Sequence, residues 1–196
     1  MANTCTTIDR RTLLCGLGAL ALAPLARAAT LPGDSIYHLS AVLVDQRGQR
    51  FDLAARRGQP MLVSMFYGSC QMVCPMIFET VRATLKALPA EDAAALRVLM
   101  VSFDPARDTV EALARTAQAH GCDDRWTLAR ADEATARSIA AVLGIQYRRL
   151  DSGEFNHSTV IEAVDRDGRI VATTSTLGAV DPAFVKAVRR MREVAG

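Results

Sequence analysis

A continuous apolar run, PMLVSMFY at residues 60–67, constrains the fold more than any other stretch of this sequence. Its length is typical of one β-strand, and its lack of polar alternation indicates that both faces of the strand are covered. From Met76 to Leu88 apolar residues recur at helical spacing, and Pro75 suits a first helical turn, where its missing N–H costs nothing. A buried strand followed directly by an amphipathic helix predicts an α/β fold.

The rest of the chain continues this alternation. Further strands are predicted at residues 96–104 and 125–130, and further helices at 108–121, 132–143 and 181–194. Asp108 is the predicted cap of the first of these helices, and Gly121 and Gly144 are predicted to end the first two.

Two hairpins flank the alternating part. One is predicted over residues 36–54 around Gly48, and the other over residues 157–175 with Asp167-Gly168 at its turn. Strands and helices in this order predict an α/β, thioredoxin-like sandwich, in which helices flank a central mixed sheet and an N-terminal hairpin is added.

The first 28 residues have the composition of an export signal. The pair Arg10-Arg11 precedes an uncharged apolar run at residues 12–26, and Ala26-Arg27-Ala28 gives a small-x-small cleavage pattern. The run is shorter than the roughly 20 residues that a membrane-spanning helix needs. We therefore expect a cleaved signal of twin-arginine type rather than a membrane anchor. The sequence predicts a periplasmic protein of bacterial type in which residues 29–196 form a single domain.

Composition limits the classes of partner. Half of the residues are apolar, which is enough for one compact domain with a core. The formal net charge is only +2 and the basic residues are scattered. We therefore expect no nucleic acid partner.

The expected cleavage changes the cysteine count, because Cys5 and Cys15 lie within the signal. Cys70, Cys74 and Cys122 remain, an odd number for an oxidising compartment. Two of them are expected to act together. Cys122, at the end of a predicted helix, is interpreted as a partly buried structural residue.

Cys70 and Cys74 are predicted to lie where open α/β sheets commonly place their chemistry. Cys70 follows the strand at 60–67, and Cys74 begins the next helix. The positive end of a helix dipole favours the thiolate, which is the form that attacks disulfides and binds metals. Residues four apart on a helix lie about 5–6 Å apart at Cβ, so both sulfurs can approach one ion or each other.

Three uses of this pair are open: a redox-active dithiol, a metal site, or two buried structural cysteines. The spacing in CQMVC is one residue longer than the C-x-x-C of thioredoxin-like reductases. A structural zinc site needs four protein ligands, and a second cysteine pair is missing. Two thiolates with one imidazole would suit copper.

The sequence contains three histidines as candidates for such an imidazole. His38 lies in the opening hairpin and His120 directly precedes a predicted helix stop, and we interpret both as structural. His157 is predicted in a loop directly before a central hairpin strand, which leaves it open as a ligand or a structural residue.

Three motifs now occur together and in order: CQMVCP, SFDPARDT and HST. With them the chain resembles the Sco/SenC family of copper-binding thioredoxin-fold proteins over essentially its whole mature length. The resemblance implies that Cys70, Cys74 and His157 bind copper, as Cu(I) or Cu(II). It also implies that Asp104, in the second motif, lies behind these ligands and tunes them. From the residues alone, Asp104 is equally well explained as part of an Asp-Pro turn.

The resemblance also implies a function and partners. Members of this family deliver copper to, or maintain reduced thiols for, the dinuclear copper centre of cytochrome c oxidase. The expected partner is a copper-accepting client, the oxidase subunit that carries this centre, together with a thioredoxin-like reductant or another copper chaperone.

The chain departs from the family around the two thiols. Gly68, Ser69, Gln71 and Met72 replace residues that are usually more polar or acidic, and a threonine usually precedes the first cysteine. Met72 could offer a thioether to Cu(I) or could fill the core. Two neighbouring methionines are predicted to lie in the core, Met65 and Met76.

The rival hypothesis is an enzyme, a thiol-disulfide oxidoreductase that keeps client cysteines reduced. Cys70 would then be the nucleophile and Cys74 the resolving thiol. A reductase should tolerate the loss of His157, whereas a copper site should not. A peroxidase is a third hypothesis, which no further feature of the sequence requires.

Overall fold

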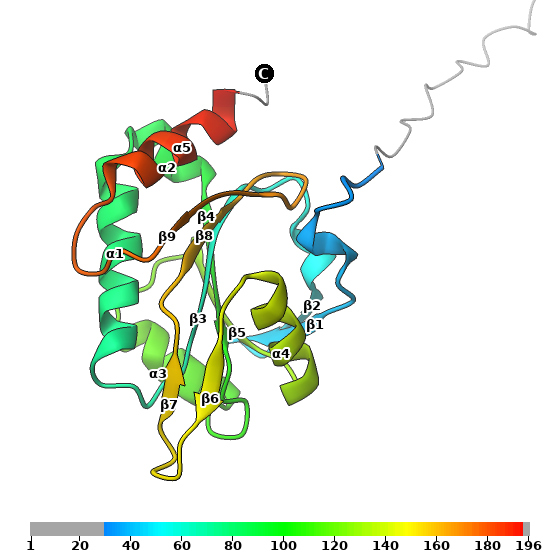
Figure 1. The fold of residues 1–196 in the computed structure, drawn as a ribbon, viewed down its shortest axis with the longest axis vertical. Coiled ribbons are helices and arrows are strands. Elements are labelled where there is room, and N and C mark those ends of the chain that lie inside the picture. Colours follow the sequence, from blue (N-terminus) through cyan, green and yellow to red (C-terminus); the bar gives the residue numbers. More distant parts are fainter. Residues whose placement is uncertain (1–29, 194–196) are drawn as a thin grey trace, which may run out of the picture. The chain divides into compact units, whose positions relative to one another are not determined.

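A seven-stranded mixed sheet is the centre of the computed structural model, which describes residues 30–193 (Figure 1). The order of its strands is β2-β1-β5-β4-β3-β8-β9. Strands β3, β4 and β5 are parallel, and the other neighbouring pairs are antiparallel. The strands are β1 (Val42–Asp45), β2 (Arg50–Asp52), β3 (Met61–Phe66), β4 (Arg97–Ser102), β5 (Trp126–Arg130), β8 (Ile161–Val164) and β9 (Ile170–Thr174).

Helices cover both faces of this sheet. They are α1 (Val73–Ala87), α2 (Ala90–Ala95), α3 (Val110–Ala119), α4 (Glu133–Val142) and α5 (Pro182–Glu193), with short 3-10 helices at Ile36–His38 and Leu53–Arg56. Helices α1 and α3 lie on one face and α4 on the other (Figure 1). On the first face, Phe78 of α1 packs against Phe66 and Trp126, with ring centroids 5.5 and 5.7 Å apart. On the second face, Ile139 of α4 borders the same small apolar cavity as Val63 and Leu99.

Strand β3 is the central strand that the apolar run predicts. All six of its residues are buried, and its neighbours are β4 and β8. Both faces of the strand are therefore covered, and the strand needs no polar alternation. The predicted thioredoxin-like sandwich and both predicted hairpins are present.

The predicted cap of α3 is wrong by one residue. Thr109 is the cap, since its side chain accepts a hydrogen bond from the N–H of Ala112. Asp108 is instead turned into the protein and accepts hydrogen bonds from Gly68 and Ser102. The sequence offers two good capping residues side by side, and tertiary contacts decide between them.

A second, two-stranded sheet was not predicted. Strands β6 (Tyr147–Arg149) and β7 (Phe155–His157) form an antiparallel hairpin. His157 is therefore the last residue of a strand and does not lie in a loop. Three-residue strands are too short to show alternation in a sequence, and aromatic packing holds this hairpin in place: Phe155 lies 5.1 Å from Phe103 and 5.2 Å from Tyr67, between ring centroids.

The prediction for the methionines holds for Met65 and is wrong for Met76. Met65 is buried, whereas 41% of Met76 is exposed on the first turns of α1. Helical spacing extends the apolar face of α1 back to Met76, but the residues of this turn that enter the core are Cys74 and Ile77, on either side of Met76 in the sequence.

No helix within residues 30–193 has both the length and the apolar character needed to cross a bilayer. The predicted signal at residues 1–28 lies outside the residues that the structure describes. Export therefore stays a prediction.

Candidate metal centre

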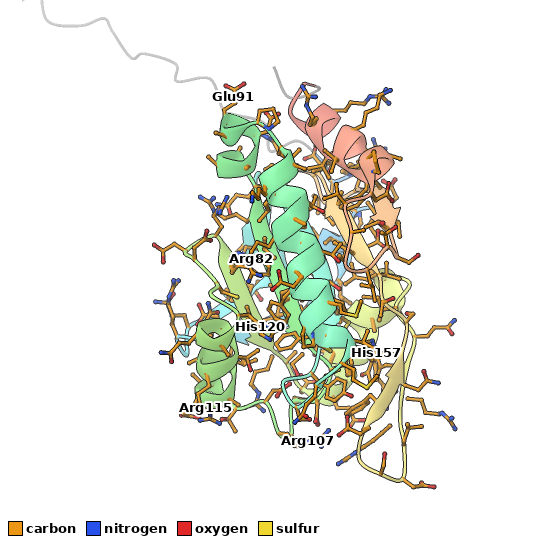
Figure 2. The ribbon with its side chains drawn as sticks, turned by 90° about the vertical axis from the view of Figure 1, so that its left-hand side faces the viewer. Arg82, Glu91, Arg107, Arg115, His120 and His157 are labelled. Carbon is orange, nitrogen blue, oxygen red and sulfur yellow. The ribbon has the colours of Figure 1, made fainter. Side chains whose placement is uncertain are left out.

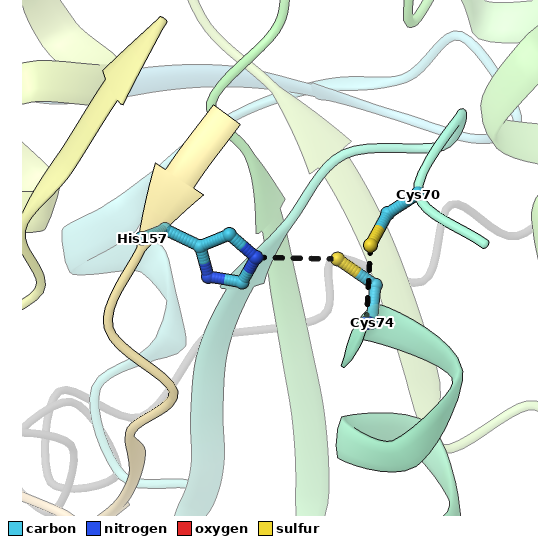
Figure 3. A group of neighbouring side chains, drawn as sticks. All are labelled: Cys70, Cys74 and His157. Atoms are coloured by element: carbon cyan, nitrogen blue, oxygen red, sulfur yellow. Dashed lines mark hydrogen bonds between the residues drawn. The ribbon is translucent and has the colours of Figure 1, made fainter. Parts of the chain in front are cut away.

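The two cysteines lie where β3 leads into α1. After β3 ends at Phe66, the chain turns, and the N–H of Cys70 donates to the carbonyl of Tyr67 at 3.2 Å. Cys74 lies in the first turn of α1, and only 2% of it is exposed, whereas Cys70 is half-buried (Figure 3). The geometry places one thiol at the surface and the other beneath it.

The Cys70 thiol takes the place of a helix cap. Met72, at the N-cap position of α1, makes no side-chain capping bond, and the N–H of Cys74 donates to Cys70 Sγ at 3.3 Å. Burial opposes ionisation of Cys70, but hydrogen bonds from the N–H groups of Cys74 and Met72 outweigh it and lower the pKa of this thiol. Burial raises the pKa of the Cys74 thiol, and the neighbouring Cys70 adds to the effect.

His157 points its free nitrogen at the cysteines. Its Nδ1 lies 3.0 Å from the carbonyl oxygen of Ser158, which can only accept, so Nδ1 carries the hydrogen in the neutral ring. Nε2 is then unprotonated, and it lies 3.9 Å from Cys74 Sγ (Figure 3). The carbonyl of Ser158 thus fixes the tautomer that a metal ligand at Nε2 requires.

The ligand atoms of Cys70, Cys74 and His157 all lie within 4.8 Å of one another. Among residues 30–193, this is the group of three that could hold a metal ion. Metal–sulfur and metal–nitrogen bonds are about 2.0–2.3 Å long, so small side-chain adjustments would bring all three atoms onto one ion. Two thiolates and an imidazole form a soft set that suits copper, and three ligands fall short of the closed set of four in a structural zinc site.

The site opens into a groove of about 510 Å³. Its lining comes from the cysteine loop and from strand β7: Tyr67, Ser69, Cys70, Gln71, Met72, Val73, Glu154, Phe155, Asn156 and His157. Cys74 is not part of this lining. Solvent and partners therefore reach the site from the side of Cys70 and His157.

Tyr67 connects the two segments that carry the ligands. Its hydroxyl donates to Glu154 at 2.6 Å, and its ring packs edge-on against the ring of His157 at 5.9 Å. Burial and the bond to Glu154 raise the pKa of Tyr67, so it remains a neutral donor. Sequence reasoning missed this residue, although it is the last residue of the apolar run and lies three residues before the first cysteine.

Asp104 reaches the site only through intermediates. Its buried carboxylate pairs with Arg107, which also donates to the carbonyl of Gly153 at 2.7 Å, in the turn of the β6–β7 hairpin that carries His157. Arg107 and His157 lie at the end of the molecule where α1 begins (Figure 2). The predicted tuning role of Asp104 stays a prediction, with a structural route by which it could act.

Asp108 holds the cysteine loop more directly. Its buried carboxylate accepts from the N–H of Gly68 at 3.0 Å and from the hydroxyl of Ser102, while burial raises its pKa. A Cβ atom at Gly68 would lie 2.6 Å from this carboxylate, so any larger residue there would force the carboxylate to move. Sequence reasoning assigned Asp108 to a helix cap, but its place in the SFDPARDT motif was a signal for a role at the site.

The remaining histidines and the third cysteine lie outside the group. His120 stacks on Phe78, with ring centroids 4.1 Å apart, and exposed His38 contacts the carbonyl of Pro32 at 2.8 Å. His38 lies on the 3-10 helix that precedes the opening hairpin and not in the hairpin itself. Cys122 is half-buried, and burial raises the pKa of its thiol to about 11. These contacts agree with structural roles.

Fold and site together define a class: a thioredoxin-fold protein in which two thiols and an imidazole form a group that could hold a metal ion. Comparison with known proteins identifies the family within this class. The chain belongs to the SCO1/SenC family, whose sequence model matches residues 36–192.

A curated relative and two solved structures illustrate the similarity. A protein of Stutzerimonas stutzeri that is named for copper binding is 32% identical over 71 residues; the match covers 36% of this chain and about a third, 35%, of that relative. Arabidopsis thaliana ScoI, solved with copper bound, has a TM-score of 0.69 and 17% identity, over 78% of this chain and 96% of that structure. BsSco, described as a member of the Sco family of cytochrome c oxidase assembly proteins, has a TM-score of 0.65 and 17% identity, over 79% and 90% of the two chains. At these identities the two structures establish the shared fold.

The difference between the two thiols leads to a first prediction. In the reduced protein, iodoacetamide should modify Cys70 well before Cys74, because Cys70 is accessible and its pKa is lowered, while Cys74 is buried and its pKa is raised. Timed labelling at neutral pH, followed by digestion and mass spectrometry, measures both rates in one sample. Equal rates would contradict the arrangement of an outer and an inner thiol.

Proposed function

We propose that this protein is an exported copper chaperone that binds one copper ion and delivers it for assembly of the dinuclear copper centre of cytochrome c oxidase. The observation that carries the proposal is the convergence of Cys70, Cys74 and His157 to within 4.8 Å in a member of the SCO1/SenC family. Copper binding in the named relative and in the Arabidopsis structure, and the oxidase assembly role in the description of BsSco, support it.

The geometry suits a carrier better than a permanent metal site. Three protein ligands leave copper open to a fourth ligand from an acceptor, and the groove gives that ligand a way in. Copper can then pass by ligand exchange, in which a bond to the acceptor forms as a bond to this protein breaks. A closed set of four ligands would have to open first.

Copper loading depends on the redox state of the thiols, because only thiolates bind the metal. A disulfide between Cys70 and Cys74 would remove two of the three ligands. The protein therefore needs a reductant, for which a thioredoxin-like protein is the proposed partner, and a source of copper, which another copper chaperone could supply.

One observation favours a second function, thiol-disulfide exchange. Cys70 has the accessibility and the hydrogen bonds of an attacking thiolate, and Cys74 lies next to it as a resolving thiol. In this alternative the protein keeps client cysteines reduced, and His157 has no chemical role.

The proposed site of action is the periplasm. It rests on the export signal that the sequence predicts at residues 1–28. The oxidising environment there also makes a reductant for the two thiols necessary.

The delivery proposal is tested with the mature chain, residues 29–196, reduced and loaded with copper. On mixing with the soluble, metal-free domain of the oxidase subunit that carries the dinuclear centre, copper should move to that domain and its visible spectrum should appear. A second sample of the domain, with its cysteines oxidised, should be mixed with the metal-free, reduced protein. Reduction of the oxidised domain without copper transfer in the first sample would favour the oxidoreductase instead.

A further inference from the structure

Met72 is exposed in a way that packing does not explain. It is 78% exposed, whereas the other exposed large apolar side chains of residues 30–193 range from 37% to 44%. Burial of a methionine side chain is typically worth about 1.5–3 kcal/mol, and this position gains almost none of it. The interpretation of Met72 as core filler is therefore wrong.

The location of Met72 relates it to the metal-ligand group. It lies two residues from each cysteine and lines the same groove as Cys70 and His157. Its side chain is largely exposed to solvent, so few contacts restrict its rotation. A flexible thioether therefore stands on the open side of a site whose inner wall is the buried Cys74.

The chemistry of a thioether suits a site that exchanges Cu(I). Thioether sulfur is a soft, uncharged ligand that prefers Cu(I), and it needs no deprotonation before it binds. It is weaker than a thiolate, so it would hold an ion briefly and release it to the pair of cysteines. These are the properties of a ligand that acts during transfer.

We propose that the Met72 thioether is the outer ligand through which Cu(I) enters and leaves the site of Cys70, Cys74 and His157. The proposal rests on the proposed copper function and adds a route to it. During loading, a bond from the Met72 sulfur to Cu(I) forms as the ion loses a ligand of its donor. Bonds from the two cysteines and from His157 Nε2 then form as the remaining ligands of the donor leave, the thiol protons pass to water, and the bond to Met72 breaks. Copper stays Cu(I) throughout, and release follows the same steps in reverse.

The test compares the rates of Cu(I) exchange in the reduced mature protein and in Met72→Leu. Leucine keeps the apolar volume and removes the sulfur, and a side chain so exposed can change without unfolding the protein. Met76→Leu is the matched control, because Met76 is also exposed, lies only four residues further along the chain in α1, and does not line the groove. The coloured complex of Cu(I) with bicinchoninate serves as donor for loading, and free bicinchoninate serves as acceptor for release, both followed anaerobically by stopped flow.

Met72→Leu should slow loading and release by the same factor, at least about tenfold. This is the low end of the effect that loss of a residue supporting a metal site typically has on affinity or activity. The equilibrium affinity for Cu(I) should stay that of the wild type, because Met72 binds the ion only between the two end states. The Cu(II) spectrum should not change. In wild type labelled with ¹³C at the methionine methyl groups, the Met72 resonance should shift on titration with the Cu(I) complex, while that of Met76 should not.

Rates equal to those of Met76→Leu would overturn the proposal. Loss of Cu(I) affinity at an unchanged loading rate would overturn it too, since Met72 would then be a permanent ligand. Failure of the wild type to take up any copper would instead refute the proposed function on which it rests.

Discussion

His157→Ala is expected to abolish tight binding of Cu(II) while the protein stays folded. The change removes one of three proposed ligands. Loss of a residue that only hydrogen-bonds to a metal ligand typically lowers metal affinity by about 10- to 100-fold, so loss of a ligand itself should lower the affinity by more. The reduced wild type should bind one equivalent of Cu(II) and show strong sulfur-to-copper charge-transfer bands, and these bands should be absent in the variant. Titration followed by visible absorption measures both the stoichiometry and the bands.

The control for this variant is His38→Ala. His38 is exposed, and its Nε2 contacts only the carbonyl of Pro32 among the hydrogen bonds of the described residues. The control should bind copper as the wild type does. Circular dichroism of His157→Ala should match the wild type, with a modest loss of stability from the ring contacts with Phe103 and Tyr67, about 0.5–1.5 kcal/mol for each aromatic contact. Wild-type copper binding by His157→Ala would remove this residue from the site and would favour the oxidoreductase.

The sequence predicts those parts of the fold that local pattern and burial determine together. Strand β3 is such a case, because six consecutive buried residues leave an apolar run that is hard to mistake. The turn at Gly168 and the start of α4 near Asp132 are others, since their side chains and backbone angles act within a few residues. The β6–β7 hairpin shows the opposite case, because its position depends on the rings of Tyr67 and Phe103, which come from two distant segments.

The residues of the site also fall into those that local pattern predicts and those that only contacts between distant segments bring together. Cys70 and Cys74 could be placed from sequence because a strand end and a helix start fix both of them. His157 lies 83 residues beyond Cys74, and only the resemblance to a family connected them. Tyr67 and Glu154 act through contacts between segments, so no local pattern marks them, and only the SFDPARDT motif pointed to the buried Asp108. The exposure of Met72 is a property of the folded surface, and the sequence left open whether this side chain binds Cu(I) or fills the core.

Substitution of either Cys70 or Cys74 by serine should remove copper binding as completely as His157→Ala, whereas Cys122→Ser should retain one equivalent. A serine hydroxyl stays protonated at neutral pH and is a hard ligand, so each variant loses a thiolate bond and a negative charge. Cys122 is the matched control, because it is a half-buried free thiol outside the ligand group. Copper titration of the three reduced variants decides the point, and wild-type affinity in Cys70→Ser or Cys74→Ser would exclude that cysteine as a ligand.

The same two variants separate the chaperone from the oxidoreductase by a second readout. If Cys70 attacks client disulfides, Cys74→Ser should accumulate a mixed disulfide with a model dithiol substrate, because the resolving thiol is gone, and Cys70→Ser should form none. A chaperone whose thiols serve only as ligands should accumulate little adduct in either variant. Cys74→Ser should also be less stable to urea, by about 1–3 kcal/mol, if its hydroxyl finds no partner at this buried position. Mass spectrometry under non-reducing conditions counts the adduct, and adduct on Cys74 instead of Cys70 would reverse the roles of the outer and the inner thiol.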